Sequence, residues 1–244
     1  MLSKQAEFQA RKDRILGITI EHYIETISPV SSAFIANETS LDLSPATIRN
    51  IFGELEDEGY LTHPHTSAGR IPTEKGYRYY VDHLMLDIQF LEEEKRRVKS
   101  EYKKQSLELE DLLEQTSRVI SEMTHYTSII SVDGWGNKIF CQGTSFLAGY
   151  PDYQDLKKIR NILAALDEKE RLLEIINRNL HHKIDILIGE EIADSQMDSC
   201  SLVVSQYRTK KGPSGRIAIL GPTRMHYDRV VSALEYFSQL MEEI

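Results

Sequence analysis

Apolar residues recur at helical spacing in the first third of the chain and gather into short β-type runs in the second half. The positions that indicate a long amphipathic helix near the start are Ile15, Tyr23, Ile24 and Ile27. This helix should end before Ser28-Pro29, because the residue ahead of a proline is displaced from the α region. A short helix is then expected from Ser31 or Ser32.

A third helix has both of its ends specified by the sequence. Ser44 can cap it, Pro45 suits the first helical position because it has no amide hydrogen to leave unbonded, and Gly59 is a typical C-terminal stop. Its apolar stripe consists of Ile48, Ile51, Phe52 and Leu55. The opposite face, which is small, polar and rich in donors, carries Ala46, Arg49, Asn50 and Gly53.

A two-stranded hairpin follows this helix. Residues 60–62 and 70–72 indicate strands, residues 63–69 a turn, and Thr73 the start of another helix. The order of helix, short helix, turn, capped helix and hairpin is that of a winged helix-turn-helix. The second helix of this motif enters the major groove of DNA, and the hairpin, or wing, reaches the backbone or the minor groove.

Residues 86–126 form a polar stretch with mixed charges, which suits a long solvated helix. Apolar positions spaced alternately by three and four residues favour packing on a partner helix as a coiled coil. Those proposed for a dimer contact are Leu109, Leu112, Val119 and Met123. The alternative is a connector helix that lies on its own C-terminal domain.

From residue 127 the pattern is α+β. Strands are expected at 128–132, 138–142, 184–188, 201–207 and 216–220, with helices over 152–180 and 226–242. In the helical block, one stripe is Leu156, Ile159, Ile162, Leu163 and Leu166, and another is Leu172, Leu173, Ile175 and Ile176. An antiparallel sheet with helices packed against it accounts for this order. The predicted organisation is therefore 1–85, 86–126 and 127–244.

Composition and charge narrow the class of protein. The 244 residues are 41% hydrophobic and 27% charged, as in globular proteins, and no apolar run is long enough for a membrane helix or an export signal. Two cysteines without CxxC spacing favour a reducing cytoplasm. The net charge of −9 opposes wholesale nucleic-acid binding, yet residues 60–80 carry a local basic excess.

Motifs for catalysis or for a metal are weak. His63-Pro64-His65 lacks further ligands at zinc-like spacing, and the sequence contains no GxGxxG, GxxxxGK[ST] or GxSxG. Gly221-Pro222-Thr223-Arg224 could hold an anion, or it could be a sharp strand-to-helix corner. We therefore expect a protein that is not an enzyme, with no catalytic residue, metal site or cofactor.

Longer motifs resemble the heat-inducible transcription repressors of bacteria, the HrcA family. In the N-terminal part they are residues 43–50, 54–61 and 64–78, and downstream they are residues 142–145, 168–173, 188–191, 200–203 and 221–225 with Tyr227. The resemblance covers most of the chain, with its motifs in the family's order.

The resemblance implies a fold and a function. Family members are dimeric repressors with a winged-helix domain, a GAF-like domain and an inserted dimerising domain. They bind an inverted-repeat operator, the CIRCE element, upstream of chaperone operons, and the GroEL chaperonin helps to keep them active. Where the family carries its insertion, this chain has only the short turn at 133–137, so that module is expected to be absent. The alternative function is that of a GAF-type regulator that senses a small molecule.

Candidate DNA-binding residues follow from the winged-helix prediction. On the recognition helix they are Ser44, Ala46, Thr47, Arg49, Asn50 and Gly53. On the wing and the helix after it they are His65, Thr66, Ser67, Gly69, Arg70, Lys75 and Arg78. Arg49 and Asn50 are expected to read bases, since arginine and asparagine can form paired hydrogen bonds with guanine and adenine. Alternatively, Arg49 pairs with Glu56 or Asp57 on the protein surface.

Overall fold

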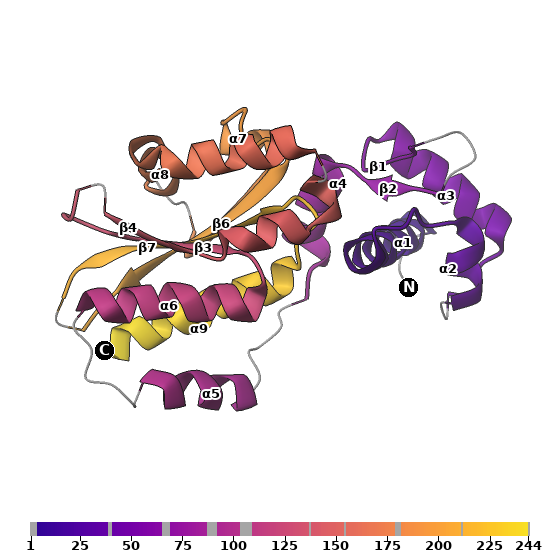
Figure 1. Cartoon of the computed structure of the whole chain (residues 1–244). Helices are drawn as coiled ribbons and strands as arrows, with labels where there is room; N and C mark the ends of the chain where they lie inside the picture. The colour runs from indigo at the N-terminus through magenta and orange to yellow at the C-terminus, as the bar shows by residue number, and fades with distance from the viewer. Residues whose placement is uncertain are drawn as a thin grey trace. The chain divides into compact units, whose positions relative to one another are not determined.

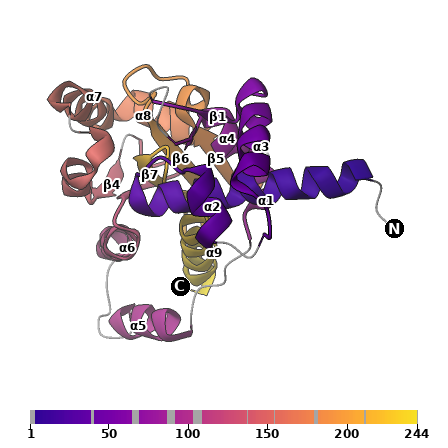
Figure 2. The same ribbon diagram turned by 90° about the vertical axis from the view of Figure 1, so that its right-hand side faces the viewer.

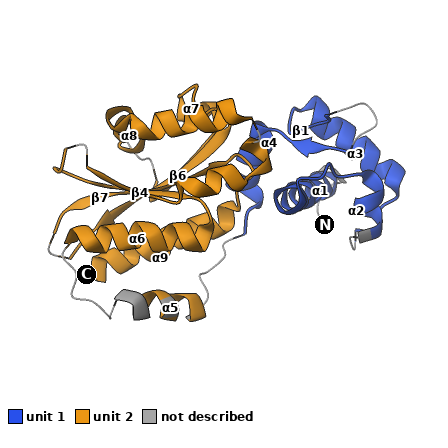
Figure 3. Cartoon of the chain, viewed as in Figure 1, with its two compact units in different colours: residues 1–86 blue, residues 87–244 orange. Residues whose placement is uncertain are grey.

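The computed structural model describes residues 4–38, 41–64, 69–86, 92–102, 109–136, 138–153, 155–178, 182–210 and 212–243. The chain divides into two compact units, residues 1–86 (unit 1) and residues 87–244 (unit 2), which are coloured separately in Figure 3. Each unit has its own buried core.

Unit 1 is a winged helix-turn-helix, as the sequence predicts (Figures 1 and 2). Its elements are α1 (Lys4–Thr26), α2 (Ser32–Glu38), α3 (Pro45–Asp57), β1 (Leu61–Thr62), β2 (Ile71–Pro72), α4 (Glu74–Tyr79) and the wider helical turn η1 (Tyr80–Leu84). The helices enclose a core of fully buried aliphatic residues, among them Ile15, Ile20, Ile35, Ile48 and Leu55.

Helix α3 has the ends that its sequence specifies. The Ser44 hydroxyl accepts a hydrogen bond from the Thr47 amide at 3.1 Å, and Pro45 occupies the first turn. After the helix, Gly59 has φ +77°, a left-handed conformation that glycine adopts without a Cβ penalty. The predicted apolar stripe is buried at all four positions, namely Ile48, Ile51, Phe52 and Leu55.

The wing hairpin has a very short ladder. Strands β1 and β2 pair antiparallel through Leu61 with Pro72 and Thr62 with Ile71. Val30, ahead of α2, adds an isolated antiparallel bridge to Arg70. Because the ladder is so short, side-chain contacts must contribute to holding the wing in place.

Unit 2 contains a five-stranded antiparallel sheet in the order β4-β3-β7-β6-β5. The strands are β3 (Thr127–Val132), β4 (Ile139–Gln142), β5 (Ile184–Ile188), β6 (Cys200–Arg208) and β7 (Ser214–Pro222). These are the five predicted strands, with ends shifted by no more than two residues. The hairpin between β3 and β4 includes Gly134 and Gly136, both at positive φ.

Helices cover both faces of this sheet (Figure 1). They are α6 (Leu109–Thr124) and α9 (Tyr227–Glu243) on one face, and α7 (Leu156–Asp167) and α8 (Lys169–Ile176) on the other. Shorter 3-10 turns are η2 (Thr144–Gly149), η3 (Pro151–Tyr153) and η4 (Gly189–Ile192). The result is the GAF-like α+β architecture that the resemblance implies.

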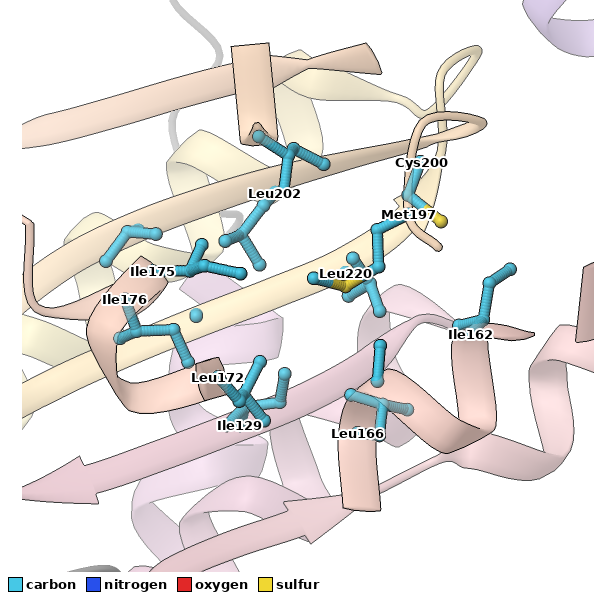
Figure 4. Close-up of a cluster of buried hydrophobic side chains, with 14 of the residues drawn as sticks. Ile129, Ile162, Leu166, Leu172, Ile175, Ile176, Met197, Cys200, Leu202 and Leu220 are labelled. Carbon is cyan, nitrogen blue, oxygen red and sulfur yellow. The ribbon is translucent and has the colours of Figure 1, made fainter. Parts of the chain in front are cut away.

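The main core of unit 2 lies between the sheet and the helices α7 and α8 (Figure 4). Ile162, Leu166 and Leu172 from the helices pack with Ile129 and Leu220 from the strands. The stripe over 172–176 is buried as predicted. The prediction for α7 was wrong at two positions, since Leu156 is 80% exposed and Leu163 is 38% exposed. Leu156 is the first residue of α7, where its side chain lies beyond the edge of the core.

The predicted helix over 86–126 is described as two helices, α5 (Glu92–Tyr102) and α6, with residues 103–108 outside the described part. Helix α5 lies against α9. The Tyr236 hydroxyl donates to the Lys95 carbonyl at 3.1 Å, and Lys99 is 3.4 Å from Glu243. Helix α6 packs on β3, β4 and α9. Both helices therefore belong to unit 2.

Candidate nucleic-acid interface

The face of α3 opposite its buried stripe is open to solvent. Ala46, Thr47, Arg49 and Asn50 are exposed and Gly53 is half-buried. The Ser44 and Thr47 hydroxyls lie 2.9 Å apart, so these two side chains complete the N-terminal cap. The exposed first turns therefore offer a guanidinium and a carboxamide, the two groups best suited to reading base edges in the major groove.

The Arg49 side chain makes no hydrogen bond or ion pair with the residues that the structure describes. The alternative, in which Arg49 pairs with Glu56 or Asp57 on the protein surface, is not what the structure shows. Glu56 instead pairs with Arg70, with 2.8 Å between Arg70 Nη2 and Glu56 Oε2, and with His63 Nδ1. The Arg49 side chain is therefore available to a partner.

The wing lies only partly within the described residues. His65, Thr66 and Ser67 fall outside them. Gly69 and Arg70 are described, and Gly69 lies so close to the backbone of Val30 that an added Cβ would sit 2.5 Å from its carbonyl oxygen. Glycine is therefore required at this position because the two backbones pack so closely.

Lys75 and Arg78 both have contacts within unit 1. The Lys75 ammonium donates to the Glu58 carbonyl at 2.7 Å and lies 4.8 Å from the centre of the Tyr60 ring. Arg78 forms an ion pair with Asp82 at 3.3 Å. Phosphate binding by either residue would have to share or replace these contacts.

The residues predicted for a dimer seam are largely turned inward. Leu112 and Val119 are buried, while Leu109 and Met123 are half-buried. The exposed side chains of α6 are mainly charged, as at Glu110, which pairs with Lys138. This is the arrangement of the second alternative, a helix that lies on its own C-terminal domain.

The Gly221-Pro222-Thr223-Arg224 motif forms a closed corner. Arg224 is 8% exposed and pairs with Asp152, with Nε and Nη2 at 2.8 and 2.7 Å from Oδ2. The Tyr126 hydroxyl accepts a hydrogen bond from the His226 amide beside it, and burial raises the pKa of Tyr126. Arg224 is therefore already occupied by a carboxylate. The sequence does not reveal its partner, because Asp152 lies 72 positions earlier.

The two cysteines are unpaired and shielded. Burial raises the pKa of the Cys141 thiol to about 11 and that of the Cys200 thiol to about 12. Thiols of this kind are chemically inert at neutral pH. Within the described residues, no group of three or more His, Cys, Asp or Glu side chains is placed to hold a metal ion.

A winged helix-turn-helix joined to a GAF-like domain defines a transcription regulator that binds DNA. Residues 132–231 match the family model described as HrcA protein C terminal domain. Two similar proteins are named heat-inducible transcription repressor HrcA. The one from Moorella thermoacetica is 29% identical over 96% of this chain and 98% of its own length, and the one from Symbiobacterium thermophilum is 27% identical over the same shares. The chain is a homologue of the HrcA repressors, as its motifs indicate.

A solved structure supports the fold independently. A crystal structure titled only as that of a hypothetical protein matches with a TM-score of 0.75 and 19% identity, and it covers 100% of this chain and 98% of its own. Among the described residues, no helix is long and apolar enough to cross a membrane.

The relatives are longer than this chain. The alignment with the Moorella protein spans 338 positions but contains 96% of a chain of 244 residues. About a hundred positions of the relative therefore have no counterpart here, as expected for a short form that lacks an inserted module.

Proposed function

We propose that this chain represses the transcription of heat-shock chaperone operons by binding an inverted-repeat operator as a dimer in the cytoplasm. The observation that carries the proposal is the exposed face of α3, where the side chains of Arg49 and Asn50 have no ion pair or hydrogen-bond partner among the described residues. In winged-helix proteins the corresponding helix enters the major groove. The names of the relatives supply the biological context.

A titration with three DNA duplexes tests the proposal. Fluorescence anisotropy would compare a CIRCE-type inverted repeat, a duplex with one half-site, and a scrambled duplex of equal length. A two-headed repressor binds the inverted repeat most tightly, the half-site less tightly and the scrambled duplex weakly, because the second contact is intramolecular. Equal affinity for the repeat and the scrambled duplex would reject sequence-specific repression.

Dimerisation needs a surface that remains open. Leu112 and Val119 are covered by unit 2 itself, which leaves Leu109 and Met123 on α6 or an exposed face of the GAF-like domain. On that domain, Leu156 and Leu163 are the large apolar residues that α7 exposes. Sedimentation of Leu109→Asp and of Leu156→Asp would assign the interface, since a charge placed in the contact dissociates the dimer. A dimer that survives both changes must use another surface.

The chaperonin GroEL is proposed as a partner that keeps the repressor active, as the resemblance to the family implies. Refolding after heat would be compared with and without GroEL and ATP, with operator binding as the readout. A higher recovered fraction of active repressor with the chaperonin supports this partner. Equal recovery would show that GroEL is not needed to keep the repressor active.

A second candidate function is that of a regulator that senses a small molecule. It is favoured by a hollow of about 450 Å³ in unit 2, lined by polar residues that include Asp133, Gln206, Arg208 and Arg216. A thermal-shift screen with common metabolites would identify a ligand by its stabilisation of the folded state. A specific ligand that also changes operator affinity would favour this function over chaperone-dependent control.

A further inference from the structure

One carboxylate on the recognition helix contacts both arms of the wing. Glu56 lies near the end of α3, and its two oxygen atoms have different partners. Oε1 contacts His63 Nδ1 on the outgoing arm, and Oε2 lies 2.8 Å from Arg70 Nη2 on the returning arm. Both arms are therefore linked to the same side chain of α3.

The position of this contact in the hairpin matters. The described register of β1 and β2 stops at Thr62 and Ile71, so His63 and Arg70 are the next residues toward the tip. The Glu56 carboxylate therefore closes the hairpin at the point where its backbone ladder ends. It also joins that point to the helix that would read the DNA.

The two arms are held in different ways. Arg70 exchanges two backbone hydrogen bonds with Val30, at 2.8 and 2.9 Å, and Gly69 packs tightly against the same backbone. The His63 side chain, by contrast, is held by its contact with Glu56. Loss of Glu56 should therefore release the outgoing arm more than the returning arm.

The contact is partly shielded from water. The side chains of Arg70, Glu56 and His63 are 23%, 26% and 36% exposed. An ion pair with this burial is screened less by salt than a fully exposed one. A carboxylate on the DNA-facing side of a repressor would also repel phosphates, and Arg70 and His63 offset that charge.

We infer that Glu56 is a positioning residue that fixes the wing against the recognition helix, and that Arg70 acts on Glu56 rather than on a phosphate. This inference rests on the proposed function, because the wing matters only if the chain binds DNA. It replaces the expectation that Arg70 supplies charge to the DNA backbone. Two effects of Glu56 on operator affinity have opposite signs: holding the wing in place strengthens binding, whereas the negative charge repels phosphates and weakens it.

The test compares Glu56→Gln, Arg70→Gln and the double variant, with Asp57→Asn as the matched control. Asp57 is exposed on the same turn of α3, and no ion pair is described for it, so its replacement removes one charge without breaking this contact. Operator affinity and its salt dependence would be measured by anisotropy. Urea unfolding would confirm that every variant is folded.

If Glu56 positions the wing, Glu56→Gln and Arg70→Gln each weaken operator binding by about tenfold, and the double variant is no weaker than either single variant. The slope of log affinity against log salt stays unchanged, because no phosphate contact is lost. Asp57→Asn binds at least as tightly as the wild type. Tighter binding by Glu56→Gln would overturn the inference, as would a slope lowered by about one in Arg70→Gln but not in Glu56→Gln.

Hydrogen exchange on the protein without DNA keeps the two proposals distinguishable. In Glu56→Gln, the amides of residues 61–63 and, to a smaller extent, those of residues 70 and 71 should exchange faster than in the wild type, while those of α1 stay protected. Asp57→Asn should leave both regions unchanged. Unchanged exchange in the wing of Glu56→Gln would refute the positioning role. Wild-type protein that fails to bind any duplex would refute the proposed function instead.

Discussion

In unit 1, the exposed face of α3 presents Arg49 and Asn50 to solvent, whereas in unit 2 comparable polar groups are closed on one another. Arg224 is bound by Asp152, and the hydroxyls of Ser201 and Tyr227 lie 2.7 Å apart in the interior. Pro45, in the first turn of α3, lies four positions ahead of Arg49, and Pro222, at the end of β7, lies two positions ahead of Arg224. The comparison shows that an arginine close after a proline is open to solvent in one unit and held by a carboxylate in the other.

The two units also differ in the extent of their β-sheets. Unit 1 has a ladder of two residue pairs, and unit 2 has five strands of which β3, β6 and β7 are mostly buried. The core of unit 2 can therefore hold its shape through apolar burial. The wing of unit 1 depends on individual contacts such as that of Glu56. Changes in the core of unit 2 should accordingly affect stability most strongly, and changes in the wing of unit 1 should affect DNA binding.

The largest expected effect is on the closed corner of unit 2. Asp152→Ala leaves Arg224 buried without its carboxylate, and we expect a loss of about 3–5 kcal/mol in the free energy of unfolding of unit 2. Urea unfolding monitored by the single tryptophan, Trp135, would measure it. Asp155→Ala is the comparator, because it removes the N-cap of α7 and should cost about 1 kcal/mol. A smaller loss for Asp152→Ala than for Asp155→Ala would show that the corner is not a structural element.

A smaller effect is expected at the N-terminal end of α3. Ser44→Ala removes the acceptor for the Thr47 amide and should cost about 1 kcal/mol, whereas Ser44→Gly should cost only a few tenths of that. Hydrogen exchange of the first α3 amides would measure both values. Equal protection in the wild type and Ser44→Ala would mean that the cap adds nothing to the stability of this helix.

The smallest effect at neutral pH is expected from the thiols. In the folded state the pKa of Cys141 is raised to about 11 and that of Cys200 to about 12, from an ordinary value of 9.0. Their contribution to stability is therefore fully present below about pH 9 and is lost as the pH rises through the folded values. Native protein at pH 8 should react slowly with a thiol reagent, and urea should expose both thiols. Rapid reaction in the native state would contradict their burial.

Local signals predicted the fold well where they act over a few residues. Ser44, Pro45 and Gly59 fixed the ends of α3, and the alternation of apolar residues located all five strands of unit 2. Residues 86–126 were harder, because polar residues with mixed charges are compatible with one helix or with two. Contacts with α9, such as that of Tyr236 with Lys95, place α5 within unit 2 and are not visible in a local pattern.

The candidate site was predicted only in part, because local patterns place some of its residues but do not reveal contacts between distant elements. The exposed face of α3 follows from helical periodicity, so the positions of Arg49 and Asn50 could be read directly. The partners of Arg70 and Arg224 could not, because Glu56 and Asp152 lie on other elements of the fold. A sequence shows that an arginine is present, but only the folded chain shows whether a carboxylate already holds it.

The central claim is that Arg49 reads a base from an otherwise open helix face. We would titrate the wild type, Arg49→Ala and Arg14→Ala, which removes a cation from α1, with the inverted repeat and with single-base variants of each half-site. Arg49→Ala should lose about 1–3 kcal/mol on the intact operator and become indifferent to one base per half-site, with unchanged stability in urea. Arg14→Ala should keep the full base preference. If Arg49→Ala retains wild-type affinity and wild-type discrimination at every position, the claim is wrong.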